Sequence, residues 1–172
     1  MCDIIKKEEN SPRHIITKNN FVVFTPWASF YPYEFWICPK NHEVSVFRTS
    51  QKQIADLSEV LQLSLKTMVK TIGNVPFNLI VYTSPEKKTS KQIHWRIEIY
   101  PRINDGKYLE IGTKIFVNEI SPEFAAKELK NKLKKNPRMR AMYIHYNKKT
   151  KKELEEYRKI AQKFIKKVTK YG

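Results

Sequence analysis

The sequence predicts an α+β fold: a mostly antiparallel sheet of five or six strands, one long helix packed on it, and a helical C-terminal extension. Residues 92–102 alternate between polar and apolar side chains, which is the pattern of a strand with two different faces. Residues 51–72 place their apolar side chains along one stripe of a helix. Shorter apolar segments are bounded by Pro, Gly or Asn, as strands joined by turns usually are.

The first strands are predicted at residues 14–18 and 21–25, as a hairpin that turns at Asn19 and Asn20. Pro26 ends the second strand, because proline cannot donate to the ladder. The aromatic segment 27–33 is interpreted either as a packed surface loop or as a platform beside a pocket for a flat ring. Another strand is predicted at residues 34–39.

Ser50 is a suitable N-cap for the helix at residues 51–72, and Gly73 is suited to ending it. The apolar stripe of this helix consists of Ile54, Leu57, Leu61, Leu65, Met68 and Ile72. Residues 77–83 are strongly apolar and predict a strand in the centre of the sheet.

The alternating segment places His94, Arg96 and Glu98 on one face of a central strand. This polar face is either a half-exposed surface with an Arg–Glu pair or a binding surface. A further strand is predicted at residues 108–118, interrupted at Gly112. Residues 121–123 have the composition of a helix start, and that helix is expected to end near residue 137.

The chain has 172 residues, of which 41% are hydrophobic, so we expect a folded globular domain at residues 1–136 and a basic amphipathic helical extension at residues 137–172. No apolar run is long enough for a membrane span, and the first residues lack the apolar core of a signal peptide. Cys2 and Cys38 do not form a disulfide framework. We therefore expect a reduced, cytoplasmic protein with no membrane partner.

The net charge of +16 is concentrated at the C-terminal end, because residues 127–172 hold 17 Lys/Arg and only 4 Asp/Glu. One interpretation is a set of lysines on the solvated face of a docked helix. The alternative is a nucleic-acid or ribonucleoprotein interface, because clustered cations with interleaved aromatic residues suit a phosphate backbone. Its candidate residues are Lys134, Lys135, Arg138, Arg140, Lys148, Lys149, Lys151 and Lys152.

Six segments of the sequence occur in an order that matches a known family: residues 2–5, 22–28, 30–32, 34–42, 94–102 and 121–126. Over residues 2–130 the sequence resembles the C-terminal domain of galactose-1-phosphate uridylyltransferase, a member of the histidine-triad superfamily. The resemblance implies a histidine-triad-like fold and a relation to nucleotidyl transfer, in which a histidine carries the nucleotidyl group as a covalent intermediate.

The resemblance places Arg96 where the family's nucleophilic histidine stands and Glu98 at the third position of the triad. Arginine stays protonated and has no nucleophilic lone pair, so the family's chemistry cannot run from Arg96. Three hypotheses follow: a subunit whose nucleophile half is a separate chain, a binding protein without catalysis, or transfer from His94. The last is the least favoured, because His94 lies one pleat repeat away from the nucleophile's position.

The expected ligand is a nucleotide or sugar phosphate, and Arg96 would hold its phosphate by charge-assisted hydrogen bonds. The expected partners are a separate chain with the nucleophile half or a second copy in a homodimer. The family's domain also tends to hold a structural metal through His and Glu, but His94 and Glu98 alone are too few ligands to define a site, so no cofactor is assigned and a structural metal stays an open alternative. The binding residues expected from the resemblance are His94, Arg96, Glu98, Lys40, Thr113 and Asn118.

Overall fold

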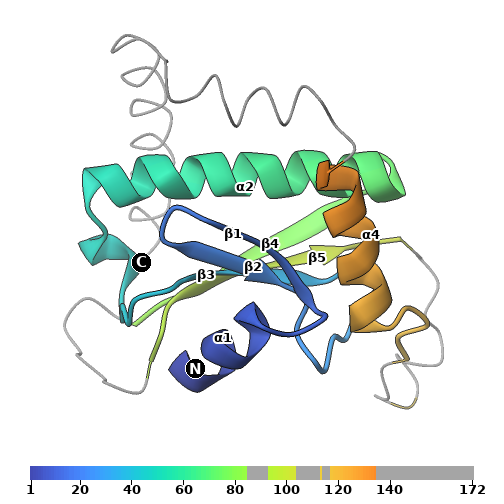
Figure 1. Cartoon of the computed structure of the whole chain (residues 1–172), viewed down its shortest axis with the longest axis horizontal. Coiled ribbons are helices and arrows are strands. Elements are labelled where there is room, and N and C mark those ends of the chain that lie inside the picture. The colour runs from blue at the N-terminus through green and yellow to red at the C-terminus, as the bar shows by residue number, and fades with distance from the viewer. Residues whose placement is uncertain (85–92, 104–112, 114–116, 135–172) are drawn as a thin grey trace, which may run out of the picture.

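The computed structural model describes residues 1–84, 93–103, 113 and 117–134 (Figure 1). Within these residues the chain forms one five-stranded sheet with helices on both of its faces. The helices are α1 (Cys2–Glu9), α2 (Gln51–Ile72), α4 (Pro122–Lys134) and the 3₁₀ turn η1 (Val46–Arg48). The strands are β1 (His14–Lys18), β2 (Phe21–Phe24), β3 (Phe35–Pro39), β4 (Phe77–Tyr82) and β5 (Arg96–Pro101).

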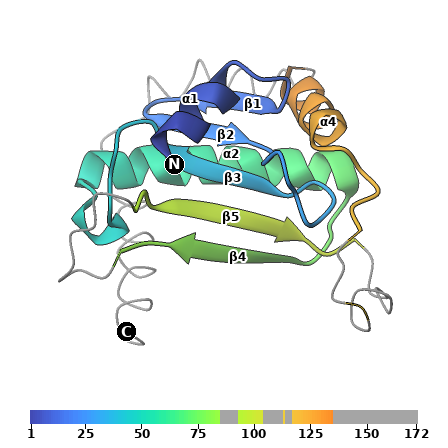
Figure 2. The same cartoon turned by 90° about the horizontal axis from the view of Figure 1, so that it is seen from below.

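The strand order is β1-β2-β3-β5-β4, and every neighbouring pair is antiparallel. The predicted hairpin at residues 14–25 is confirmed, with Asn19 in the left-handed region at its turn. The prediction of a central position for the apolar strand at residues 77–83 is wrong, because β4 forms the edge of the described sheet (Figure 2). The prediction assumed that an apolar strand is buried between two neighbouring strands, but most residues of β4 are exposed.

α2 covers one face of the sheet and builds the main core with it. Its predicted N-terminus is confirmed as a capping box, in which Ser50 and Gln53 bond each other's backbone N–H groups. Gly73 ends the helix with a φ of 87°, which favours glycine. The core beneath α2 is closed by strand residues that alternate with the polar ones, among them Val23, Phe35, Ile37, Ile97 and Ile99.

α1 lies against the opposite face, over β1 and β2, and was not predicted from the sequence (Figure 2). Its Ile5 is buried with Val22, Phe24 and Cys38 in a second, smaller apolar cluster. Ion pairs hold its C-terminal end: Arg13 bonds Glu8 at 2.9 Å, and Lys40 bonds Glu9 at 2.7 Å. The helix therefore covers the β1–β2 side of this face, and β4 and β5 extend beyond it.

α4 begins where residues 121–123 predict a helix start, and Ser121 Oγ accepts a hydrogen bond from the N–H of Phe124. The helix packs against α2 and β1. The predicted strand at 108–118 falls almost entirely outside the described residues, as do the boundary at residue 137 and the C-terminal extension. Among the described helices, none combines the length and apolarity that crossing a bilayer requires.

Candidate metal and anion sites

His94 lies just before β5, and its ring meets α1, which lies on the face of the sheet opposite α2. It is 2% exposed, and its Nε2 lies 2.8 Å from the carbonyl oxygen of Pro39. A carbonyl can only accept, so Nε2 carries the proton, and in the neutral ring Nδ1 offers a lone pair. Burial lowers the pKa of His94, which favours this neutral form.

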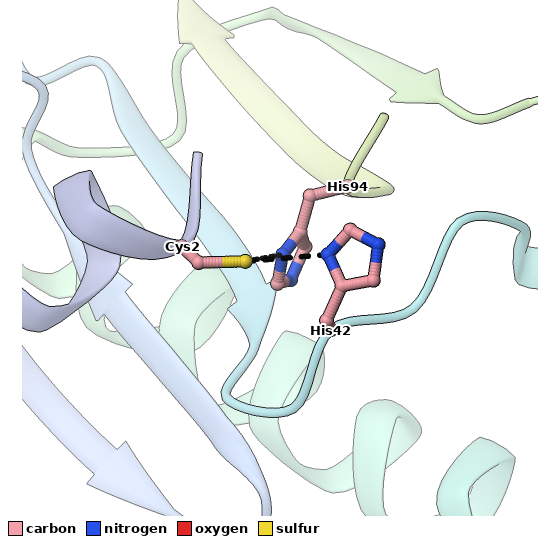
Figure 3. Close-up of side chains that lie close together, drawn as sticks. All are labelled: Cys2, His42 and His94. Carbon is pink, nitrogen blue, oxygen red and sulfur yellow. Dashed lines mark hydrogen bonds between the residues drawn. The ribbon is translucent and has the colours of Figure 1, made fainter. Parts of the chain in front are cut away.

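Cys2 and His42 meet His94 on the side of Nδ1 (Figure 3). Cys2 Sγ lies 3.2 Å from Nδ1 of His42 and 3.5 Å from Nδ1 of His94. The two imidazole rings stand nearly perpendicular, with their centroids 5.5 Å apart. Three distant segments therefore converge: the first turn of α1, the loop after β3 and the residue that leads into β5.

Backbone contacts hold the loop after β3 in place for this meeting. The N–H of Trp95 donates to the carbonyl of Glu43 at 2.9 Å, and the indole N–H of Trp95 donates to the Glu43 carboxylate at 3.0 Å. Ser84 donates its backbone N–H to the carbonyl of Val44 at 2.9 Å. These bonds fix the backbone of the loop, so they place His42 beside His94. The His42 side chain is exposed and is not needed to hold the loop.

The three side chains fit a divalent metal such as zinc. Their ligand atoms all lie within 4.8 Å of one another. A thiolate at about 2.3 Å and an imidazole at about 2.0 Å from a tetrahedral ion are roughly 3.5 Å apart, close to the two sulfur–nitrogen separations observed here. The Pro39 carbonyl would orient His94, as outer partners of metal-bound imidazoles commonly do. This trio was not predicted from the sequence.

A second arrangement lies on the open face of β5. The Arg96 guanidinium sits between two rings, 4.8 Å from the centroid of Trp36 and 4.4 Å from that of Tyr82. Its Nε donates to Glu98 at 2.5 Å. The structure gives its two terminal nitrogens no partner among the described residues, and the side chain is 24% exposed. They can therefore offer a fork of donors to an anion.

Two buried carboxylates, Glu98 and Glu34, fix the position of Arg96 and of the Trp36 ring beside it. Glu98 is 2% exposed and also accepts a hydrogen bond from the Tyr100 hydroxyl. Glu34 is buried nearby, accepts from the indole N–H of Trp36 at 2.9 Å, and has its pKa raised by burial. Glu34 thus fixes the ring of Trp36, on which the Arg96 guanidinium stacks, and Glu98 fixes the Nε of Arg96. The side chain of Arg96 is therefore held in place by both contacts.

The residues predicted for one binding face have different partners in the structure. Arg96 and Glu98 bond each other, whereas His94 belongs to the trio with Cys2 and His42. Lys40 is engaged with Glu9. Asn118 uses its amide to bind the backbone: Nδ2 donates to the carbonyl of Ser29 at 3.1 Å, and Oδ1 accepts from the N–H of Ile120.

Thr113 is exposed, and the chain on either side of it is outside the described residues. Of the proposed nucleic-acid contacts, Lys134 is the last residue of α4. The other seven also lie outside the described residues, and their role stays a prediction: Lys135, Arg138, Arg140, Lys148, Lys149, Lys151 and Lys152.

Comparison with known proteins shows which family the chain belongs to. ADP-glucose phosphorylase of Arabidopsis thaliana is 33% identical over 127 residues, which cover 72% of this chain and 36% of that protein. Galactose-1-phosphate uridylyltransferase of Thermotoga maritima is 25% identical over 139 residues, covering 76% and 43%. A solved uridylyltransferase superposes with a TM-score of 0.71 at 26% identity, covering 78% of this chain and 44% of that one. The chain belongs to the histidine-triad-like superfamily.

Within that superfamily, this chain is similar to one domain of longer proteins. It spans less than half the length of the two curated relatives. An ADP-glucose phosphorylase structure with bound ADP-glucose has a TM-score of 0.67 at 32% identity, covering 75% of this chain and 42% of that one. A zinc-bound histidine triad protein from Mycobacterium smegmatis, 18% identical with a TM-score of 0.56, shows the shared histidine-triad-like fold alone. No protein-family model matches the sequence.

Proposed function

We propose that this histidine-triad-like domain binds the phosphate of a nucleotide or nucleotide sugar on the open face of its sheet, at Arg96. The observation that carries the proposal is the fixed guanidinium between Trp36 and Tyr82, with Nε bonded to Glu98. Such a cation loses little side-chain freedom on binding, so more of each charge-assisted hydrogen bond contributes to affinity. The similarity to a phosphorylase solved with ADP-glucose supports this class of ligand.

We further propose that the domain alone does not carry out nucleotidyl transfer. Arg96 occupies the position that the family resemblance gives to the nucleophile, and a guanidinium has no free lone pair for attack on phosphorus. His94 is an unsuitable substitute because Nε2 is bonded to Pro39 and Nδ1 faces Cys2. The domain would therefore work as a binding protein, or as the half of an enzyme whose nucleophile is supplied by another chain.

The test is a calorimetric titration of ADP-glucose, UDP-glucose and their nucleoside diphosphates into the wild type and Arg96→Gln. Wild type should bind one of these with a Kd below about 1 mM, and the variant should bind it at least about tenfold more weakly, the loss expected for a charge-assisted hydrogen bond. Arg102→Gln is the matched control, since it removes the same charge from an exposed residue just past β5. Wild-type protein without measurable affinity for any of these ligands would refute the proposal.

A further inference from the structure

The strand face around Arg96, opposite α2, carries little charge. Strand residues alternate between this face and the core beneath α2, and the pairing register places residues of neighbouring strands side by side. Within the described strands β3, β5 and β4, Arg96 and Glu98 are the only charged side chains on this face. The side chains that these strands place there are Trp36, Cys38, Arg96, Glu98, Tyr100, Asn78, Ile80 and Tyr82.

Arg96 and Glu98 offset each other's charge. The Nε of Arg96 donates to Glu98 at 2.5 Å, and Glu98 is 2% exposed, so water screens its carboxylate poorly. A second buried carboxyl group, that of Glu34, lies close by, and its pKa is raised by burial and to a smaller degree by the charge of Glu98. The cation of this face therefore has acids behind it and no surplus of positive charge.

Two further cations near the ends of these strands add little at Arg96. Lys40 follows β3, and its Nζ pairs with Glu9 at 2.7 Å. Arg102 follows β5, six positions after Arg96. At the rise of a strand this is about 20 Å, which is well beyond the distance over which salt screens exposed charges. An anion at Arg96 thus meets one guanidinium with a buried carboxylate behind it.

The charge of the anion then decides how well it fits this site. Attraction to one cation grows in proportion to the charge of the anion, whereas the cost of taking the anion out of water grows with the square of that charge. The buried Glu98 carboxylate also repels each additional negative charge. A singly charged phosphate is therefore a better match to Arg96 than a doubly charged one.

We propose that this site selects a singly charged phosphate, one substituted on two of its oxygens, over the doubly charged phosphate of a monoester, and that Glu98 sets this preference. The inference rests on the proposed function, because it specifies which phosphates Arg96 takes. The surroundings suit a phosphate with organic groups on both sides, since Ile80 and Tyr82, each 41% exposed, offer apolar contact beside the guanidinium. Nucleotide sugars belong to the selected class, and sugar 1-phosphates and nucleoside monophosphates belong to the disfavoured one.

The first test compares AMP and UMP with their 5′-methyl esters by calorimetric titration into the full chain. Each pair shares base and ribose and differs by one charge. A phosphate monoester loses its second proton near pH 6, so at about pH 7.5 only about one molecule in thirty is singly charged. The methyl ester of the preferred nucleotide should therefore bind about 10- to 30-fold more tightly than the nucleotide itself. Equal affinities, or tighter binding of the nucleotide, would overturn the proposal.

The same comparison at a lower pH needs no variant. At about pH 5 the nucleotide is mostly singly charged, so its affinity should come within about threefold of that of the ester. The other titratable groups around Arg96 meet both ligands alike, so their own titration cancels in the comparison; these are Glu34, Cys38, Tyr82, Glu98 and Tyr100. A preference that persists unchanged at about pH 5 would assign it to the methyl group and contradict selection by charge.

The variant Glu98→Gln tests the role of the carboxylate. It keeps the size of the side chain and one acceptor oxygen, and at about pH 7.5 it should reduce the preference for the ester to below about threefold, chiefly through tighter binding of the nucleotide. Glu59→Gln is the matched control: Glu59 also pairs with a cation, Lys18, at 3.0 Å, but it lies on α2, on the other face of the sheet. This control should keep the full preference. A Glu98→Gln protein with the preference of the wild type would exclude the role of Glu98.

The outcomes separate this proposal from the proposed function. If Glu98→Gln does not fold, the comparison of wild type at the two pH values still decides whether charge is selected. A wild type that binds ADP-glucose or UDP-glucose but does not prefer the methyl esters, or binds neither member of each pair, refutes the selection and leaves the proposed function standing. A wild type that binds none of these ligands refutes both.

Discussion

The trio of Cys2, His42 and His94 makes the sharpest prediction, because one of its members is exposed. We expect the protein to bind one zinc ion per chain and to be stabilised by it. Zinc at about 1,000 times its Kd would raise the free energy of unfolding by roughly 4 kcal/mol. For a domain of this size, that corresponds to an increase in Tm of about 10 °C.

The informative variant is His42→Ala. His42 is exposed, so its removal should change the stability of the metal-free protein little, whereas the zinc-dependent increase in Tm should largely disappear. His14→Ala is the control, because His14 bonds Thr17 at 2.9 Å and is outside the trio. Melting curves with zinc and with chelator would be compared for all three proteins.

Cobalt gives an independent measurement, since a bound thiolate produces a charge-transfer absorption. That band should vanish in Cys2→Ser. Cys38 should not substitute for Cys2, because burial raises the pKa of the Cys38 thiol to about 12 and keeps it protonated. The interpretation would be refuted if zinc raised the Tm of His42→Ala as much as that of the wild type, or if the cobalt band survived the loss of Cys2.

Four more outcomes are expected. Arg13→Gln should lower the free energy of unfolding by about 2–4 kcal/mol in urea titrations, since it strands the buried Glu8 carboxylate; a change below 1 kcal/mol would contradict this. Arg13 also lowers the pKa of Glu123, so the stability of the wild type should fall as the pH drops below 4.5, with a shallower fall in Arg13→Gln. Intact-mass spectrometry after incubation with UDP-glucose or ADP-glucose should show no added nucleotidyl group; an adduct would disprove the proposed inactivity. If the basic extension binds nucleic acid, RNA binding should weaken steeply with salt and disappear on truncation at residue 137, and binding retained after truncation would exclude that role.

Local sequence signals predicted the elements well wherever the local structure decides the outcome. Ser50 and Gly73 delimit α2, and the alternation through residues 96–99 separates the core side chains from Arg96 and Glu98. Proline and paired asparagines likewise marked the ends of β1 and β2. These signals depend on residues a few positions apart, so they can be interpreted without the tertiary structure.

Two errors arose where the tertiary arrangement decides. The apolar composition of β4 suggested a central strand, but strand order depends on long-range pairing, and β5 lies between β4 and β3. The helix α1 was missed because its short, charged sequence has only Ile5 as a fully buried apolar side chain. Its position is fixed instead by packing and by ion pairs with residues that follow it in the chain.

The sequence by itself determined the fold class and the family resemblance, and it carries the prediction that Arg96 stands in the nucleophile's place, because these depend on residue identity and short-range order. Only the tertiary structure brought Cys2, His42 and His94 together. Cys2 and His42 are 40 positions apart in sequence, and His42 and His94 are 52 positions apart, so no short spacing motif predicts the trio. Their meeting follows from the docking of α1 and the bonding of the loop after β3 to Trp95, which are properties of the packed chain.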